Sequence, residues 1–169
     1  MRMIQQMISW LPQLLNGAKI TILLTLCAVS MGLLLSIFLA LGKMSKNKIL
    51  SGICSVYIFF FRGTPLLMQL YFIYFGLPQI NMALTINSRF FAAFLAFSLN
   101  SAAYCSEFIR AAIQSIDRGQ FEASKALGLS KAQTMQLVIF PQSIRRLVPS
   151  VANEFIMVLK DASLVSIIA

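Results

Sequence analysis

A run of uncharged, mostly apolar residues from Ile20 to Gly42 limits what this chain can fold into more than any other feature. A helix rises about 1.5 Å per residue, so about 20 residues cross a hydrocarbon core about 30 Å thick. The chain as a whole is also apolar: 59% of its 169 residues are hydrophobic, 11% are charged, and the mean hydropathy is +0.81. A soluble domain of this size carries far more charge. The sequence therefore predicts a single all-α integral membrane domain in contact with the lipid bilayer.

Basic residues predict how the chain is oriented in the membrane. Lys43, Lys46 and Lys48 crowd a short loop after the first apolar run. A second basic group lies in the polar region further along the chain and consists of Arg110, Arg118, Lys125, Lys131, Arg145 and Arg146. Loops rich in lysine and arginine stay on the cytoplasmic side. We expect the amino terminus outside, residues 1–18 as an external interfacial segment, and residues 19–169 as the transmembrane domain.

The second apolar stretch, Ile49 to Pro78, is too long for one straight crossing and is interrupted by Arg62, Thr64 and Pro65. Proline disfavours the helical conformation in the residue before it. Backbone groups freed at membrane depth are tolerated where they face protein or a water-filled cavity. Two interpretations remain open here. One is a proline kink with an arginine that reaches the membrane surface, and the other is a segment that lines a pathway.

The predicted third span, Phe90 to about Ile109, carries polar residues on one helical face. Asn100, Tyr104 and Glu107 follow a three-to-four spacing, so they share that face. Polar residues in membrane helices commonly join helices, and the alternative is that Asn100 lines a translocation path. Glu107 can also pair with Arg110, three residues further on.

A fourth span begins after Pro149 and holds Glu154, Lys160 and Asp161 within an apolar run. Such ionisable groups are costly at membrane depth unless they pair or face a cavity, which makes them functional candidates. Lys160 and Asp161 are adjacent and point in different directions on a helix, so each needs another partner. The chain ends at Ala169 inside this run, and we therefore expect about four spans and a fifth that is missing by truncation.

The region between the third and fourth spans is both polar and strongly patterned. Asp117 can act as an N-cap with Gln120 at the third helical position, so a capping box would start a helix at about Arg118. Gly128 would end this helix, because glycine accepts the left-handed conformation just past a helix C-terminus. The pattern predicts a short helix followed by a tight corner.

A second capping box, formed by Ser130 and Gln133, starts another helix that runs towards Pro141. A helix of about ten residues is barely stable alone in water, so the helix over 118–127 must pack against something. Glu122 lies early in it, where the helix dipole favours a carboxylate that can also meet a basic group on a partner. The pattern indicates a docking element, with an ordinary helical connector as the alternative.

The strings EASKALGLS (122–130) and IFPQS (139–143) resemble the cytoplasmic signature loop of permease subunits of binding-protein-dependent ABC importers. The polar amino acid uptake branch is the most similar one. Three further strings share this resemblance, which extends from about Gly17 onward: FRGTPLLMQLYFIYFGLP, AAYCSEFIRAAIQSIDRGQ and NEFIMVLKDASLVS. The departures are small in size: Ser124 replaces an alanine, Ala111 and Ala112 replace a glycine pair, Phe140 replaces a leucine, and Ala162 replaces a threonine or serine.

The resemblance implies the helical bundle of a type I ABC importer permease, in the bacterial cytoplasmic (inner) membrane. It implies a coupling loop at about 111–148, with contacts to ATPase subunits at Glu122, Ala123, Ser124, Gly128 and Pro141. It favours a translocation path or substrate role for Arg62, Thr64, Pro65, Asn100, Glu107, Lys160 and Asp161. The implied partners are a second permease subunit in a homo- or heterodimer, two ATP-binding subunits, an extracytoplasmic solute-binding protein and an amino acid substrate.

Catalysis by the chain itself is not expected. The sequence contains no GxxxxGK[ST] phosphate loop and no histidine, and Cys27, Cys54 and Cys105 lie far apart, so neither a catalytic nor a metal site is predicted. ATP would be bound by the partner subunits, and no cofactor by this chain. The basic residues are dispersed among apolar runs, which argues against nucleic acid binding. A channel or secondary-transporter subunit is the alternative function, for which filter rings or inverted repeats would be expected.

Overall fold

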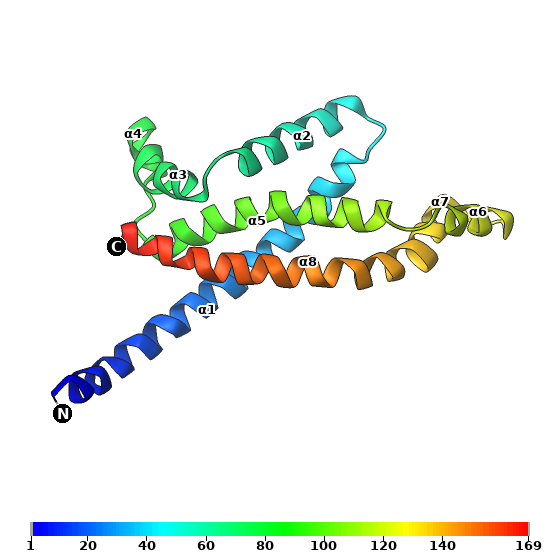
Figure 1. Cartoon of the computed structure of the whole chain (residues 1–169). Coiled ribbons are helices and arrows are strands. Elements are labelled where there is room, and N and C mark those ends of the chain that lie inside the picture. The colour runs from blue at the N-terminus through cyan, green and yellow to red at the C-terminus, as the bar shows by residue number, and fades with distance from the viewer. Residues whose placement is uncertain (1, 169) are drawn as a thin grey trace.

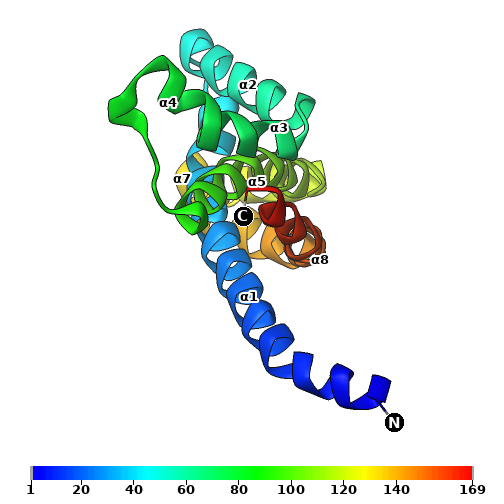
Figure 2. The same ribbon diagram turned by 90° about the vertical axis from the view of Figure 1, so that its left-hand side faces the viewer.

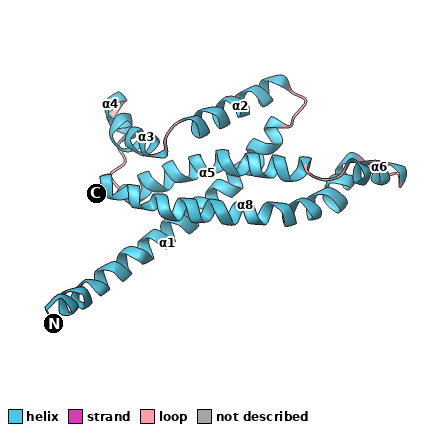
Figure 3. Ribbon diagram, in the orientation of Figure 1, coloured by secondary structure: helices cyan, strands magenta, loops and turns pink. Residues whose placement is uncertain are grey.

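The computed structural model describes residues 2–168, with side chains from Trp10 onward, and the regular structure in that range is helical throughout. Figure 1 shows its long helices, which are α1 (Arg2–Lys43), α2 (Lys48–Gly63), α5 (Arg89–Gln114) and α8 (Phe140–Asp161). Short helices connect them (Figure 3), namely α3 (Leu66–Tyr71), α4 (Leu77–Ile80), α6 (Arg118–Ala126) and α7 (Lys131–Gln133). The remaining turns are π-helical at Phe72–Gly76 and Thr134–Ile139 and 3₁₀ at Met82–Leu84 and Ala162–Ile168.

Helix α5 forms the centre of the bundle and contacts α1, α2 and α8. It approaches its neighbours closely because its inward face is built from small residues, as is common between membrane helices. The alanines at 92, 93, 96, 102 and 103 are fully buried. On the α1 side, a Cβ added to Gly32 would lie 2.9 Å from the Cβ of Ser101, so only glycine permits this approach.

Helix α1 is continuous over the expected boundary between the interfacial segment and the first span. One helix runs from Arg2 to Lys43 with Pro12 inside it, and residues Trp10–Lys43 are long and apolar enough to cross a membrane. Its amino-terminal part extends away from the other helices (Figure 2). Residues 2–18 and the predicted first span therefore belong to one helix. That this segment lies outside stays a prediction.

The predicted interruption of the second apolar stretch is confirmed. Helix α2 and the helical segment Leu66–Ile80, which contains α3 and α4, are bent by 104° relative to each other, and together they are apolar enough to form one broken span or a re-entrant loop. Thr64 takes the extended conformation expected of a residue before proline, and Pro65 is the N-cap of α3. By length and hydropathy alone, α1 and this bent pair are the membrane-crossing candidates among the described residues.

The two basic regions lie at the same end of the bundle. In Figure 1 the loop between α1 and α2 is on the side of α6 and α7, whereas α4 and both chain ends are on the opposite side. This arrangement agrees with the prediction that both regions face one compartment. Helix α8 begins at Phe140 and continues through Pro149, so the residues of the predicted fourth span belong to a longer helix.

Candidate functional site

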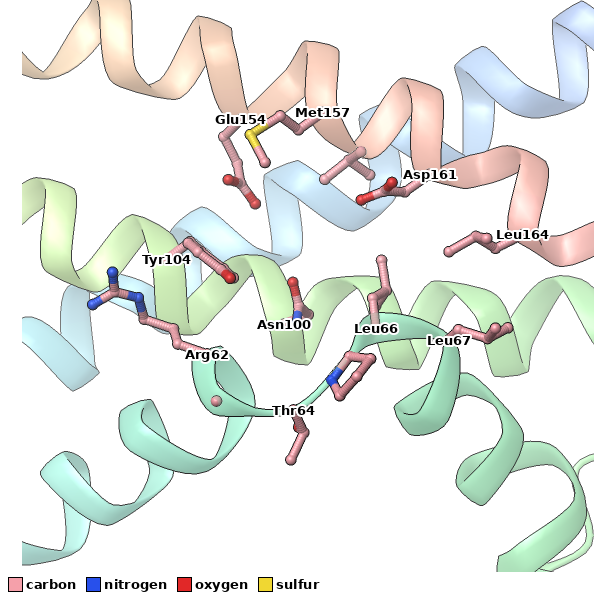
Figure 4. Close-up of a pocket in the computed structure, with 13 residues that line it drawn as sticks. Arg62, Thr64, Leu66, Leu67, Asn100, Tyr104, Glu154, Met157, Asp161 and Leu164 are labelled. Atoms are coloured by element: carbon pink, nitrogen blue, oxygen red, sulfur yellow. The ribbon is translucent and has the colours of Figure 1, made fainter.

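A cavity of about 470 Å³ opens where the corner between α2 and α3 meets α5 and α8 (Figure 4). Its lining residues are Arg62, Gly63, Thr64, Pro65, Leu66, Leu67, Asn100, Tyr104, Glu154, Met157, Val158, Asp161 and Leu164. The cavity thus brings together five residues that the sequence singled out for a translocation path, namely Arg62, Thr64, Pro65, Asn100 and Asp161. Segments far apart in the sequence form this one polar space.

Gln69 on α3 holds the corner in place. Its Nε2 donates hydrogen bonds to the Phe61 carbonyl (2.9 Å), the Thr64 carbonyl (3.1 Å) and Thr64 Oγ1 (2.8 Å). These carbonyls lost their helical partners at the break, and a buried amide supplies replacements. Gln69 was not among the predicted site residues, although it is the one amide in the run LLMQLYFIYF.

Asn100 both joins helices and faces the cavity. Its Nδ2 donates to the Phe61 carbonyl (3.0 Å) and to Gln69 Oε1 (3.1 Å), which ties α5 to the corner. The amide oxygen points towards α8 in Figure 4. The two interpretations of Asn100 as a contact between helices and as a lining residue are therefore compatible.

The charges of the cavity come from opposite walls. Glu154 and Asp161 lie on α8, seven residues apart and therefore on one face, and both line the cavity (Figure 4). Glu154 is only 3% exposed and has no basic group within 4.0 Å among the described residues. On the other wall, the Arg62 guanidinium lies 5.2 Å from the centre of the Tyr104 ring. Glu154 and Tyr104 were noted in the sequence but not placed in the predicted path.

Glu107 and Lys160 lie outside this cavity. Glu107 binds Lys43 Nζ at 2.7 Å and Arg110 Nη2 at 2.7 Å, and Arg62 Nη1 is 3.9 Å away. The predicted pair of Glu107 and Arg110 is confirmed, and the two further cations come from the ends of α1 and α2. Lys160 is exposed, and among the described residues no ion pair joins it to Asp161, since adjacent residues on a helix do not face each other.

The predicted corner after α6 is confirmed. Gly128 has φ +75°, Gly128 N–H donates to the Lys125 carbonyl (3.0 Å), and Leu129 N–H donates to the Ser124 carbonyl (3.1 Å). These two bonds form a Schellman motif, which satisfies carbonyls that a helix end leaves free. The capping box of Ser130 and Gln133 is also present.

The capping box expected at the start of α6 is only half formed. Asp117 Oδ1 accepts a hydrogen bond from Gly119 N–H (2.6 Å), so Asp117 is the N-cap. The Gln120 side chain does not return to Asp117, because its Oε1 accepts from Gln142 Nε2 on α8 (3.0 Å). Arg146 of α8 also donates to the Ser115 carbonyl at the end of α5. Helix α6 is thus fastened to α8.

Of the predicted coupling residues, Glu122, Ala123 and Ser124 lie on α6, whereas Gly128 follows this helix and Pro141 lies in the first turn of α8. Glu122 and Ala123 are exposed, as are the apolar side chains of Phe121 and Leu127. Ser124, where the family pattern has an alanine, is buried, and its hydroxyl donates to the Gln120 carbonyl (2.7 Å). One face of α6 therefore packs on the bundle, and the other exposes charged and apolar side chains.

The sequence of this chain is similar to those of known transport proteins. A family model described as "Binding-protein-dependent transport system inner membrane component" matches residues 32–169. The arginine transport system permease protein ArtQ of Bacillus subtilis (strain 168) is 42% identical over 158 residues, which cover 94% of this chain and 71% of ArtQ. The nopaline transport system permease protein NocM of Agrobacterium fabrum (strain C58) is 37% identical over 172 residues, which cover 98% of this chain and 71% of NocM.

A solved structure shows the same fold. A chain of an amino acid ABC transporter crystallised with histidines superposes with a TM-score of 0.92 and 44% identity, covering 97% of this chain and 75% of that chain. The chain therefore belongs to the family of binding-protein-dependent transport system inner membrane components and has the helical bundle of a type I ABC importer permease.

Proposed function

We propose that the chain is the permease subunit of an ATP-driven amino acid uptake system and that its cavity holds the amino acid in transit. The observation that carries this proposal is the cavity itself, which sets Glu154 and Asp161 opposite Arg62 beside a broken span. Its volume of about 470 Å³ lies within the range of about 300–1,000 Å³ that is typical of small-molecule sites. Relatives with names such as ArtQ support an amino acid as the cargo.

The chemistry of the cavity matches the two ends of an amino acid. Asp161 can accept hydrogen bonds from the ammonium group, and Arg62 can donate to the carboxylate through its planar guanidinium. Asn100 offers its amide oxygen on the wall between them. Glu154 is a second carboxyl group, so acidic groups outnumber the one basic group in this space and favour a substrate with a positively charged side chain.

Coupling to ATP hydrolysis would pass through α6. Its exposed face, with Glu122, Phe121 and Leu127, suits a docking groove on an ATPase subunit. The hydrogen bond between Gln120 and Gln142 would transmit a movement of α6 to α8, which also carries Glu154 and Asp161. Arg146 would support this link, because it joins α8 to Ser115 at the end of α5, just before α6. Closure of two ATPase subunits on ATP would draw the docked helices together and open the path outward, and hydrolysis would reset it.

The remaining partners follow from the family. A second permease subunit, identical or related, would complete the path, and a solute-binding protein would deliver the amino acid from outside. Many large apolar side chains of α1 and α2 are exposed, including Phe38, Val56 and Phe59, and would contact lipid or the second subunit. We place the chain in the bacterial inner membrane as a multi-pass protein, with ATP bound by the partner subunits and no cofactor bound by the chain itself.

The test is amino acid uptake by proteoliposomes that contain the assembled transporter and its binding protein. Asp161→Asn removes the charge that meets the ammonium group and should reduce uptake while subunit assembly is retained. Lys160→Gln is the matched control, because Lys160 is adjacent in sequence but exposed and outside the cavity. An equal loss in both variants would contradict a substrate role for Asp161, and failure of Asp161→Asn to assemble would mean that Asp161 is structural and joins helices.

A further inference from the structure

Glu107 on α5 is surrounded by basic groups from three helices. Lys43 Nζ, at the end of α1, lies 2.7 Å from Glu107 Oε1. On the other oxygen, Oε2 accepts from Arg110 Nη2 (2.7 Å) and Nε (3.1 Å). Arg62 Nη1, at the end of α2, lies 3.9 Å from the same Oε2. One carboxylate therefore faces three positive charges.

Arg62 is the least firmly held of these three cations. A separation of 3.9 Å is too long for a hydrogen bond, and Oε2 is already occupied by two N–H groups of Arg110. The Arg62 side chain is 42% exposed, against 12% for Glu107, so water weakens this pair further. An additional anion near Arg62 can therefore compete with Glu107 for it.

Arg62 also reaches the cavity. Its guanidinium lies 5.2 Å from the centre of the Tyr104 ring, and both residues line the cavity (Figure 4). A guanidinium over an aromatic ring is attracted to its face and can turn its N–H groups without leaving it. Tyr104 and Glu107 are three residues apart on α5 and lie on one helical face, less than one turn from each other. Arg62 therefore needs only a small movement of its side chain to leave Glu107 while it stays beside Tyr104.

We propose that Glu107 is a positioning residue that competes with the substrate carboxylate for Arg62. The inference rests on the proposed function. In the empty transporter Glu107 draws Arg62 away from the cavity. When an amino acid enters, its carboxylate binds Arg62, and Glu107 keeps Lys43 and Arg110 as partners. Glu107 thus lowers the affinity of the cavity, and a transport site must bind weakly enough to release its cargo.

Two substitutions in the same cluster should have opposite effects on substrate affinity. Glu107→Gln removes the competing charge at nearly constant size, so the Kd for the amino acid should fall by about two- to fivefold, the range expected for an exposed ion pair. Arg110→Gln leaves Glu107 charged but removes one of its two closest partners, so Glu107 holds Arg62 more firmly and the Kd should rise by a similar factor. Lys43→Gln should act like Arg110→Gln and replaces it if that variant does not assemble.

The measurement is equilibrium binding to the purified, assembled transporter without its binding protein. A panel of radiolabelled protein amino acids identifies the one that binds, and its carboxamide derivative, which lacks the carboxylate, serves as the matched probe. The Kd of the amino acid should change in opposite directions in Glu107→Gln and Arg110→Gln. The Kd of the carboxamide should change in neither, and Arg62→Gln should abolish the effect of Glu107→Gln.

The outcomes separate this inference from the function on which it rests. Weaker binding in both variants, or equal changes for the amino acid and its carboxamide, would mean that the cluster only joins helices and would overturn the inference. Unchanged Kd values in a transporter that binds amino acids would also overturn it and leave the proposed function standing. A wild-type transporter that binds no amino acid in the panel would overturn both.

Discussion

Substitution of Gly128 tests whether the corner after α6 couples this chain to an ATPase. Gly128 has φ +75°, and a Cβ added there meets no atom within 4 Å. A side chain therefore creates no clash with neighbours, and its whole cost is backbone strain of about 1–2 kcal/mol for an L-residue in the left-handed region. If docking needs the native corner, that strain corresponds to an ATPase dissociation constant about 5 to 30 times higher.

The size of the effect should follow the conformational preference of the new residue. Asparagine tolerates the left-handed region best, alanine less well, and β-branched valine least, so ATPase retention should fall in the order Gly128→Asn, Gly128→Ala, Gly128→Val. Gly52→Ala is the matched control, because its added Cβ also meets nothing within 4 Å but it lies in helix α2 without a positive φ. That substitution should be neutral or should stabilise the helix.

The assay is purification of the assembled transporter in detergent, followed by measurement of retained ATPase subunit and of substrate-stimulated ATP hydrolysis. The variants should insert normally, because the membrane helices and not this corner hold the chain in the bilayer. Retention and stimulation should fall together along the series, whereas Gly52→Ala should match the wild type. Wild-type retention and stimulation in Gly128→Val would show that the corner is only a connector.

Three further predictions concern the capping box of Ser130, the contact between α8 and α5, and the topology of the chain. Ser130→Ala removes the hydroxyl that accepts a hydrogen bond from Gln133 N–H, so it should destabilise this helix start by about 1 kcal/mol. The temperature at which half of the ATPase subunit is still retained should fall, and an unchanged temperature would contradict the assigned cap. Arg146→Gln loses the contact between α8 and the end of α5 and should reduce substrate-stimulated hydrolysis more than basal hydrolysis, whereas an equal reduction would rule out a transmitting role. Cysteines placed at Asn81, Lys46 and Lys125 should report the topology: labelling from outside should reach only position 81, and labelling of position 125 would refute the orientation.

Local features of the sequence were predictable because their physical causes lie within a few residues. The corner at Gly128, the capping box of Ser130 and the break at Pro65 each depend on the conformational preference of one residue and its near neighbours. The pair of Glu107 and Arg110 is local in the same sense. The charge-free run 20–42 similarly sufficed to predict a helix that can cross a membrane.

Features that depend on distant contacts were not predictable. Gln120 was assigned to a capping box, but its side chain is taken by Gln142 from another helix. Lys43 and Arg62 reach Glu107 only because α1, α2 and α5 meet at their ends. Gln69 reaches the Phe61 carbonyl only because of the bend between α2 and α3. The sequence predicts where this bend lies, but it does not predict its angle.

Five of the seven residues predicted for a translocation path line one cavity, and their role in a path stays a prediction. A single sequence does not distinguish a polar residue that faces a cavity from one that joins helices, since both roles favour the same residue types. Glu154 and Asp161 share a face of α8, yet only their position opposite the α2–α3 corner shows that both line one space. Glu107, at the expected spacing on α5, lies beyond that space.

The central claim, that this chain moves an amino acid under the power of ATP, is tested most directly by the energy source of uptake. Proteoliposomes that contain the assembled transporter, with binding protein outside and ATP inside, should accumulate a labelled amino acid against its concentration gradient. Accumulation should persist when ionophores collapse the proton and sodium gradients, and it should stop when ATP is replaced by a non-hydrolysable analogue. Uptake that is independent of ATP and is abolished by the ionophores would contradict the claim and identify the chain as part of a channel or secondary transporter.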